Sequence, residues 1–166
     1  MASPDVSLFL WINGLAGQVA WVDRAMGVIT TDSLVPVTMA LVLLCLWFGG
    51  HGQASRAKYQ RTVILAGFGI GLTSLFVQLL SHLSPWTRPF LAGHEVTLVF
   101  YPPHDPSFPS NTAAIGMTIA TAVLLGGMRR LGLALLGLAV LFSFARIYTG
   151  VHYPLDVLGG WAVGAL

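Results

Sequence analysis

Three polar clusters interrupt an otherwise apolar chain, and their residue types suit the binding or transfer of a phosphoryl group. The clusters occupy residues 86–90, 107–112 and 146–156. Arg88 and Arg146 each offer a planar fork of donors that matches phosphate oxygens. A helix that begins near Ser110 would add free backbone N–H groups and the positive end of its dipole. Together the clusters predict an anion site.

The third cluster also contains a histidine–carboxylate pair, because His152 and Asp156 are four residues apart. If a helix begins near His152, the two side chains share a face, and Pro154 falls in a first turn that tolerates proline. A carboxylate on one ring nitrogen would leave the other nitrogen free as a nucleophile. A structural His–Asp pair, an interfacial arginine and an N-capping serine are the alternative interpretations. The joint occurrence of the three polar clusters favours the functional interpretation over these alternatives.

The elements that position these clusters are predicted to be transmembrane helices. Apolar residues make up 55% of the 166 residues and charged residues 8%, against about 25% charge in soluble domains. Apolar runs of spanning length cover 34–50, 62–82, 111–127 and 131–149, and a fifth begins near 151. Residues 5–30 contain Asp23 and Arg24, which are costly at bilayer depth, so this segment is expected to form one or two short, partly interfacial helices. We predict an all-α integral membrane bundle of five to six transmembrane helices, in a single domain over 1–166.

Basic residues indicate how this bundle is oriented. Two connections on one side of the membrane carry five of the eight: Arg56, Lys58, Arg61, Arg129 and Arg130. The positive-inside rule makes that side cytoplasmic. Arg88, Arg146 and the long loop 83–110 then fall on the outer side. The basic pI of about 9.0 is therefore a topology signal, and no nucleic-acid partner is expected.

Taken together, the clusters resemble the three-part signature of the type 2 phosphatidic acid phosphatase superfamily: Lys-x6-Arg-Pro, Pro-Ser-Gly-His and Ser-Arg-x5-His-x3-Asp. The third part is nearly intact, with Ala145 in place of the usual serine. Its remaining positions, and those of the other two parts, are Arg146, Gly150, His152, Asp156, Arg88-Pro89 and Pro109-Ser110. The stretches Arg-Pro-Phe, Asp-Pro-Ser-Phe-Pro-Ser and Gly-Val-His-Tyr-Pro-Leu-Asp are similar to bacterial undecaprenyl pyrophosphate phosphatases of the bacitracin-resistance type.

The resemblance implies a mechanism and a setting. His152 would attack the terminal phosphorus and become a phosphohistidine, with Asp156 orienting it. The phosphate oxygens would be held by Arg88, Ser110, Asn111 and Arg146. The family needs no metal or other cofactor. The expected reaction converts undecaprenyl diphosphate to the monophosphate on the outer, periplasmic face of the bacterial inner membrane, which recycles the lipid carrier for peptidoglycan synthesis.

Two positions depart from the family pattern. Ser81 stands where the first part has lysine, and Thr112 stands where the second has its general-acid histidine. A threonine hydroxyl is a far poorer proton donor than imidazolium. Thr112 is either an engineered change, or a natural one with His94 or His104 supplying the proton, or the mark of a lipid-phosphate binder that lost catalysis.

The leaving group bears on the choice of substrate. Phosphate, with a second pKa near 6, leaves without acid help more readily than an alkoxide does. Loss of the acid therefore favours a diphosphate substrate over the alternative monophosphates, phosphatidylglycerol phosphate and phosphatidate. In every case the partners are a polyprenyl or phospholipid phosphate and the lipid bilayer.

Overall fold

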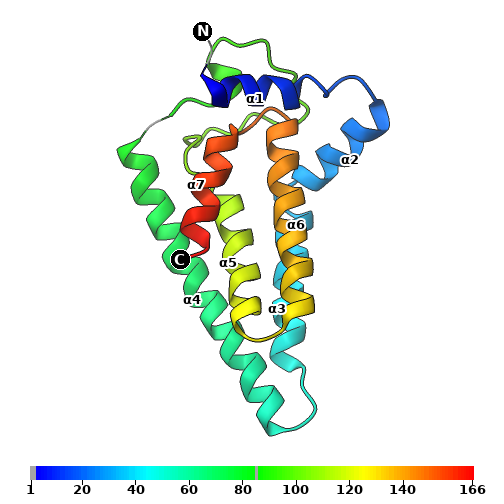
Figure 1. Ribbon diagram of the computed structural model, residues 1–166, viewed down its shortest axis with the longest axis vertical. Helices are drawn as coiled ribbons and strands as arrows, with labels where there is room; N and C mark the ends of the chain where they lie inside the picture. The colour runs from blue at the N-terminus through cyan, green and yellow to red at the C-terminus, as the bar shows by residue number, and fades with distance from the viewer. Residues whose placement is uncertain (1–2, 85) are drawn as a thin grey trace.

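The computed structural model describes residues 3–84 and 86–166, which form seven α-helices and one short 3-10 helix (Figure 1). The helices are α1 Pro4–Asn13, α2 Ala20–Thr30, α3 Leu34–Phe48, α4 Gln53–Leu83, η1 Pro89–Leu91, α5 Asn111–Leu125, α6 Arg129–Tyr148 and α7 Pro154–Gly164. The described residues contain no strand, so the all-α prediction is confirmed.

The core of the bundle is built around α5, which packs against α4, α6 and α7. Its buried positions are mostly small: Ala113, Ala114, Gly116, Thr118 and Ala120. Small side chains let neighbouring helices approach closely, which is how helices associate in a membrane. Larger buried residues from α3 and α6, among them Met39, Leu43 and Phe142, fill the remaining space.

The outer surface of the bundle is apolar. Large side chains such as Phe68 and Leu72 of α4 and Leu133 of α6 point outward and are more than half exposed. Exposed apolar surface of this extent suits lipid rather than water as the surrounding solvent. The protein is therefore a membrane protein.

Fewer helices have the length and composition of a membrane span than the sequence predicts. Two helices, α4 and α6, are long and apolar enough to cross a membrane, and the pair α2–α3, bent by 49°, is a third candidate. A straight crossing takes about 20 residues. By contrast, α5 has 15 residues and α7 has 11. The predicted count of five to six transmembrane helices is not confirmed and stays a prediction.

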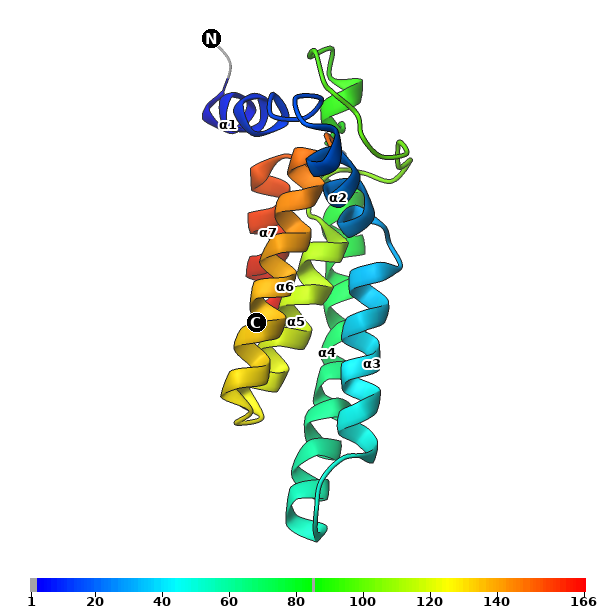
Figure 2. The same cartoon turned by 90° about the vertical axis from the view of Figure 1, so that its right-hand side faces the viewer.

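The N-terminal segment forms two short helices, as predicted for residues 5–30. The first, α1, lies across one end of the bundle (Figure 2). It is anchored there by Asn13, whose Nδ2 donates to the carbonyl oxygens of Thr97 and Tyr148, both at 2.9 Å. The N–H of Thr97 donates back to Oδ1 of Asn13, also at 2.9 Å. This buried amide therefore ties α1 to α6 and to the loop that joins α4 to α5.

Five of the eight basic residues lie at one end of the bundle, where α4 and α6 begin, and the other three, Arg24, Arg88 and Arg146, lie at the opposite end. Arg56, Lys58 and Arg61 were expected in a loop, but they lie on the first turns of α4, which begins at Gln53. Arg129 begins α6 at the same end, followed by Arg130. All the acidic residues belong to elements at the opposite end: Asp5, Asp23, Asp32, Glu95, Asp105 and Asp156. That the basic end is cytoplasmic remains a prediction.

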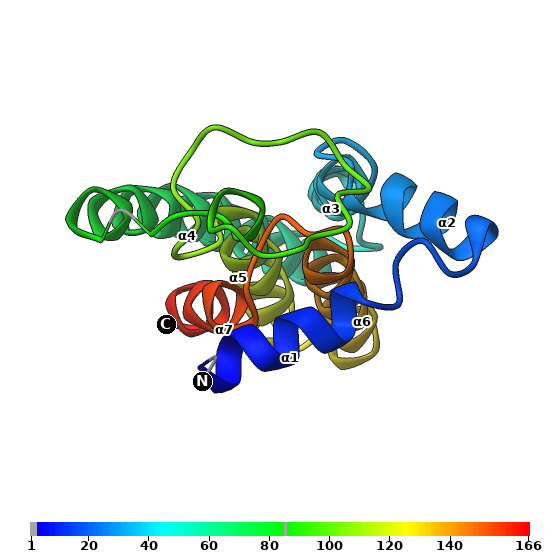
Figure 3. The same ribbon diagram turned by 90° about the horizontal axis from the view of Figure 1, so that it is seen from above.

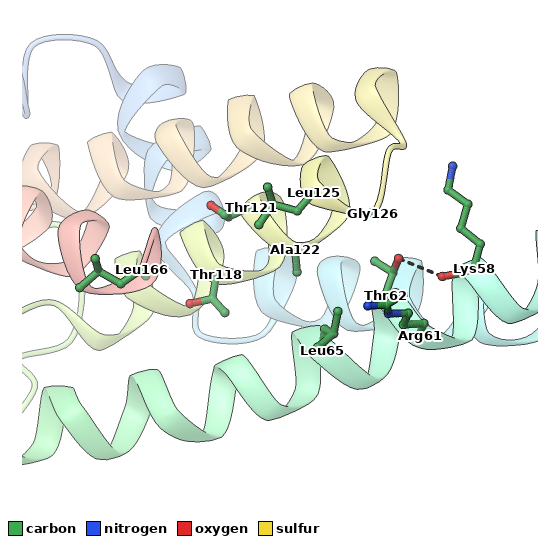
Figure 4. A pocket seen from close by; sticks show the side chains of 11 residues that line it. Lys58, Arg61, Thr62, Leu65, Thr118, Thr121, Ala122, Leu125, Gly126 and Leu166 are labelled. Atoms are coloured by element: carbon green, nitrogen blue, oxygen red, sulfur yellow. Dashed lines mark hydrogen bonds between the residues drawn. The ribbon is translucent and has the colours of Figure 1, made fainter.

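A groove of about 570 Å³ lies between α4 and α5 towards the basic end (Figure 4). Lys58, Arg61 and Thr62 line one part of it, and the Thr62 hydroxyl donates to the Lys58 carbonyl at 3.0 Å. None of the candidate site residues lines this groove. It is therefore separate from the predicted anion site.

Two glycines allow α7 to pack closely against the start of α5. Gly150 turns the chain from α6 towards α7 with φ +88°, a conformation that L side chains rarely adopt. Gly160 faces the start of α5 so closely that a Cβ there would collide with the carbonyl oxygen of Ser110. Close contact between α5 and α7 places the second and third polar clusters side by side.

Candidate active site

The three polar clusters meet at the acidic end of the bundle. Arg88 precedes η1, Ser110 precedes α5, Arg146 lies in the last turn of α6, and His152 and Asp156 lie at the α6–α7 junction and the start of α7. Figure 3 shows α1 and the α4–α5 loop over this end. All five side chains are buried. The fold therefore gathers the predicted residues into one place.

His152 contacts Asp156, as the spacing predicts, but His152 itself is not part of a helix. α7 begins at Pro154, so His152 precedes the helix and Asp156 is its third residue. Nδ1 of His152 lies 3.4 Å from Oδ2 of Asp156. The same oxygen accepts the N–H of Tyr153 at 2.8 Å and the hydroxyl of Ser107. Because a carboxylate only accepts hydrogen bonds, this contact assigns the ring proton to Nδ1.

Arg88 lies against the other side of the imidazole. Its Nη1 donates to the Val151 carbonyl at 2.8 Å and lies 3.4 Å from Nε2 of His152. Arginine has no acceptor, so Nε2 carries a lone pair in this contact. Burial lowers the pKa of His152, and the hydrogen bond to Asp156 opposes that shift without cancelling it. The ring is therefore neutral near pH 7, with its unprotonated nitrogen beside a guanidinium.

Arg146 is the second buried arginine at this end of the bundle. Its Nη1 donates to Oδ1 of Asp32 at 2.8 Å and to the Thr30 carbonyl at 3.2 Å. Its guanidinium carbon lies 5.7 Å from the ring centre of Phe100 and 5.8 Å from that of Phe142. Its buried Nε has no hydrogen-bond partner among the described residues. A buried N–H without a hydrogen-bond acceptor costs free energy unless a ligand accepts its hydrogen bond.

The start of α5 supplies further donors. Ser110 occupies the N-cap position, but its hydroxyl makes no capping hydrogen bond and lies 3.2 Å from the Thr112 hydroxyl. The backbone N–H of Ser110 donates to the carbonyl of Asp156 at 2.9 Å, which fixes α5 against α7. Asn111 is the first helical residue and is exposed. The Ser110 hydroxyl and the first-turn N–H groups are thus available to an anion.

The two departures from the family pattern have different structural outcomes. The Ser81 hydroxyl donates to the Phe108 carbonyl at 3.1 Å, so it braces the second cluster and does not replace a lysine. Thr112 lies next to Ser110, at the position expected for the acid. No hydrogen bond joins His94 or His104 to the site residues within the described part of the chain, and the assignment of either histidine as the acid stays a prediction.

Several residues at the site were not predicted from the sequence. Asp32 pairs with Arg146, and Asp105 pairs with Arg88 through Oδ2 at 2.9 Å and through its carbonyl at 2.8 Å. Ser107 supports Asp156. Asp105 lies in the long loop 83–110 and Ser107 lies in the second polar cluster, so both fall in segments that the sequence singles out. Asp32 precedes an apolar run and resembles an ordinary helix start. Nothing local in the sequence connects Asp32 to an arginine 114 positions later.

Metal ligation has no evident place here. Within residues 3–84 and 86–166, no group of three or more histidine, cysteine or acidic side chains is arranged to hold a metal ion. The independence from metals that the resemblance implies remains an expectation.

An apolar cleft of about 160 Å³ runs from Thr112 into the bundle. Its walls come from α3, α4, α5 and α6, and its lining is almost entirely hydrocarbon: Val35, Pro36, Met39, Ala40, Leu43, Ile70, Ile115, Gly116, Ile119 and Phe142. Thr112 therefore borders both the polar site, through its contact with Ser110, and an apolar space suited to a hydrocarbon chain.

A helical membrane bundle with arginine, histidine and aspartate buried at one end is the architecture of a membrane-bound lipid phosphatase. The sequence model of the PAP2 superfamily matches residues 62–166. The chain belongs to this superfamily and is a PAP2-type lipid phosphatase, as the resemblance predicted.

Individual relatives agree with this assignment. Undecaprenyl-diphosphatase BcrC from Bacillus subtilis (strain 168) is 35% identical over 166 residues, covering 98% of this chain and 79% of the relative. The crystal structure of LpxE from Aquifex aeolicus superposes with a TM-score of 0.80 at 27% identity, over 99% of this chain and 92% of that one. A phosphatidylglycerolphosphate phosphatase of PAP2 type from Bacillus subtilis has a TM-score of 0.67 at 22% identity, covering 98% and 82%, and shows the fold alone.

Proposed function

We propose that this protein hydrolyses undecaprenyl diphosphate to undecaprenyl phosphate and inorganic phosphate, through a phosphohistidine at His152. The observation that carries the proposal is the pair of buried arginines that contact His152. Arg88 does so through Nη1, 3.4 Å from Nε2 of the ring, and Arg146 through its carbonyl, which accepts the His152 N–H at 3.4 Å. Arg88 and Arg146 are only 2% and 4% exposed. Each guanidinium is paired with a largely exposed carboxylate, Asp105 or Asp32, and a phosphoryl group could accept hydrogen bonds from both arginines.

The first chemical step would form an N–P bond and break a P–O bond. Nε2 of His152 would attack the terminal phosphorus, and the bridging oxygen would leave with the lipid monophosphate. Asp156 would stabilise the positive charge that develops on the ring. Arg88, Arg146, the Ser110 hydroxyl and the first N–H groups of α5 would stabilise charge on the phosphoryl oxygens.

The second step would hydrolyse the intermediate. A water oxygen would attack phosphorus, the N–P bond would break, and inorganic phosphate would leave with His152 neutral again. With threonine at position 112 no imidazolium donates to the leaving group. A departing phosphate monoester needs that proton less than an alkoxide does, which supports a diphosphate as the substrate.

The hydrocarbon part of the substrate has a place next to the phosphoryl site. The cleft lined by Met39, Ile115 and Phe142 begins at Thr112 and is almost wholly apolar. We assign it to the first carbons of the lipid chain. We place the site on the periplasmic face because five of the eight basic residues lie at the opposite end of the bundle. Single cysteines between residues 49 and 52, labelled from either side of sealed vesicles, test the orientation: labelling from outside would place the site in the cytoplasm.

Phosphate release from pure lipids in matched detergent tests the reaction. We expect release from undecaprenyl diphosphate to exceed release from phosphatidylglycerol phosphate and from phosphatidate. The variant His152→Gln should release none from any lipid. A clear preference for either monophosphate lipid would contradict the proposed substrate.

Position 112 decides between an enzyme and a second candidate, a lipid-phosphate binder without catalysis. Thr112 is the observation that favours this alternative. A general acid contributes about 10²–10⁴-fold, so Thr112→His should raise phosphate release by that order for monophosphate lipids and by less for the diphosphate. If Thr112→His releases no phosphate from any lipid and traps no phosphohistidine, the chain is a binder.

A further inference from the structure

The groove between α4 and α5, at the end of the bundle remote from the candidate active site, combines two cationic side chains with a hydrocarbon wall. Lys58 and Arg61 line it where the polar first turns of α4 give way to its apolar stretch. The Lys58 side chain extends towards the turn between α5 and α6, where a Cβ at Gly127 would lie 3.0 Å from its Nζ (Figure 4). Within residues 3–84 and 86–166 neither cation makes an ion pair, and every acidic residue belongs to the other end.

A second groove, of about 430 Å³, adjoins the first along α4 and leads away from the basic end. The two share the lining residues Thr118, Gly164 and Leu166, and are here together termed the lateral groove. The hydroxyls of Thr73 and Thr118 lie 2.9 Å apart and hydrogen-bond each other. The remaining lining of the second groove is hydrocarbon, with its large side chains from α4 and α7: Leu72, Leu75, Phe76, Leu79 and Val163. The lateral groove is therefore cationic at one end and apolar over the rest.

This distribution has the polarity and the length of half a bilayer. Arg61 and Leu72 are eleven positions apart on one helix, a rise of about 16 Å. The hydrocarbon core of a bilayer is about 30 Å thick, so one leaflet contributes about half of that. An acyl chain whose headgroup lies at Arg61 would therefore end beside Leu72 and Phe76. Two cations with no acidic neighbour favour a headgroup with net negative charge.

We propose that the lateral groove binds an anionic phospholipid at a site distinct from the phosphoryl site. The phosphodiester accepts hydrogen bonds from Lys58 and Arg61, and one acyl chain lies against Leu65, Leu72 and Phe76. None of the candidate active-site residues lines either part of the groove, so the lipid held there is bound and not hydrolysed.

Lipid binding to the whole chain in detergent tests the charged end of the site. Native mass spectrometry measures the affinity for phosphatidylglycerol and for phosphatidylcholine with the same acyl chains. We expect wild type to prefer phosphatidylglycerol about tenfold. The double variant Lys58→Gln/Arg61→Gln should bind phosphatidylglycerol about ten- to thirtyfold more weakly, with little change for phosphatidylcholine.

The matched control is Arg129→Gln/Arg130→Gln, which removes the same charge from the same end of the bundle. These two arginines do not line the lateral groove, so the affinity for phosphatidylglycerol should stay within about twofold of wild type. Neither pair of residues contacts the phosphoryl site, so a lipid held there contributes equally to all three proteins.

A second pair of variants tests the hydrocarbon wall without changing charge. Leu65→Trp places a larger side chain in the groove and should weaken binding of both lipids about tenfold. Ile64→Trp is its control, because Ile64 is the neighbouring residue of α4, is similarly exposed and lies outside the groove. Both positions are more than half exposed, so neither substitution disturbs the core.

Equal losses of phosphatidylglycerol affinity in the two double variants would overturn the proposal, because they would mean that the surface charge of this end acts without a defined site. Unchanged affinity in Lys58→Gln/Arg61→Gln would overturn it as well. If wild type is instead a dimer that Leu65→Trp dissociates, a second copy of the chain covers the groove and the lipid assignment is wrong.

Discussion

Ser107 donates its buried hydroxyl to Oδ2 of Asp156, the same oxygen that faces Nδ1 of His152. The other oxygen, Oδ1, is buried without a partner in the described structure. Ser107 therefore fixes the rotation of the carboxylate, and it acts on the imidazole only through Asp156. It is a positioning residue.

Replacing Ser107 with alanine should slow phosphohistidine formation about tenfold, because a hydrogen bond to a charged group contributes about 1.5–3 kcal/mol. The pH at which the rate is half-maximal should also move, since Asp156 would hold the imidazole less firmly. Rapid-quench measurement of the phosphoenzyme across pH provides both values. Ser81→Ala is the matched control, because Ser81 braces the same cluster through Phe108 without touching Asp156. Equal slowing in the two variants would mean that Ser107 only stabilises the loop.

Asp156→Asn should keep the shape of the site and remove its negative charge. The amide cannot stabilise the imidazolium, and it allows the wrong ring tautomer. We expect phosphohistidine formation to fall by about 10⁴-fold, as for other histidines deprived of their orienting carboxylate. Asp23→Asn serves as the control, because Asp23 accepts the Tyr148 hydroxyl at the same end of the bundle but does not contact His152. A rate above one-tenth of wild type in Asp156→Asn would contradict the orienting role.

The rate of phosphoenzyme formation should fall only below pH 6.5, the ordinary pKa of histidine. Burial lowers the pKa of His152, so the nucleophile stays unprotonated at a pH where a free imidazole is already half charged. An acid limb centred above pH 6.5 would show that the buried environment does not keep the ring neutral.

Folding stability should follow the same titration. The unfolded chain binds a proton at His152 more readily than the folded chain, so stability is lost as pH falls from about 6.5 towards the lower folded-state pKa. His152→Gln should lack this component. Thermal unfolding of the two proteins between pH 7.5 and pH 5 measures the difference, and parallel pH curves would contradict it.

Asn13→Ala should lower the free energy of unfolding by about 2–3 kcal/mol. The substitution removes three hydrogen bonds and leaves the buried Tyr148 carbonyl with one partner fewer. Gln18→Ala is the control, because Gln18 is exposed and makes a single long contact of 3.5 Å. Unfolding in a fixed detergent mixture measures both. A loss below about 0.5 kcal/mol for Asn13→Ala would show that α1 is held mainly by its apolar contacts.

The parts of the site that were predicted are those encoded by short spacing or by the order of the helices. His152 and Asp156 are close because they flank a helix start, and Arg88 and Arg146 join them because their segments end on the same face. The pairing of Asp32 with Arg146 was not predictable, because it depends on how α2 bends into α3. The roles of Ser81 and Ser107 depend on the path of one loop, which hydropathy does not determine.

The helices themselves were predicted in place and type, but not in length. α4 extends well beyond its apolar stretch, so basic residues assigned to a loop are helical. Hydropathy measures which residues tolerate lipid, whereas the start of α4 is set by Gly52, which precedes the helix with a non-helical φ of +99°.

Truncating the chain before residue 62 would remove the contacts made by the amide of Asn13. The match to the superfamily model begins at residue 62, yet Asp32 and Thr30, which accept hydrogen bonds from Arg146, and Asn13, which anchors α1, all precede that point. A fragment that begins where the superfamily model begins would expose Arg146 and release the end of α6. In this protein, the segment that matches the superfamily model is smaller than the segment that must be expressed to assemble the candidate site.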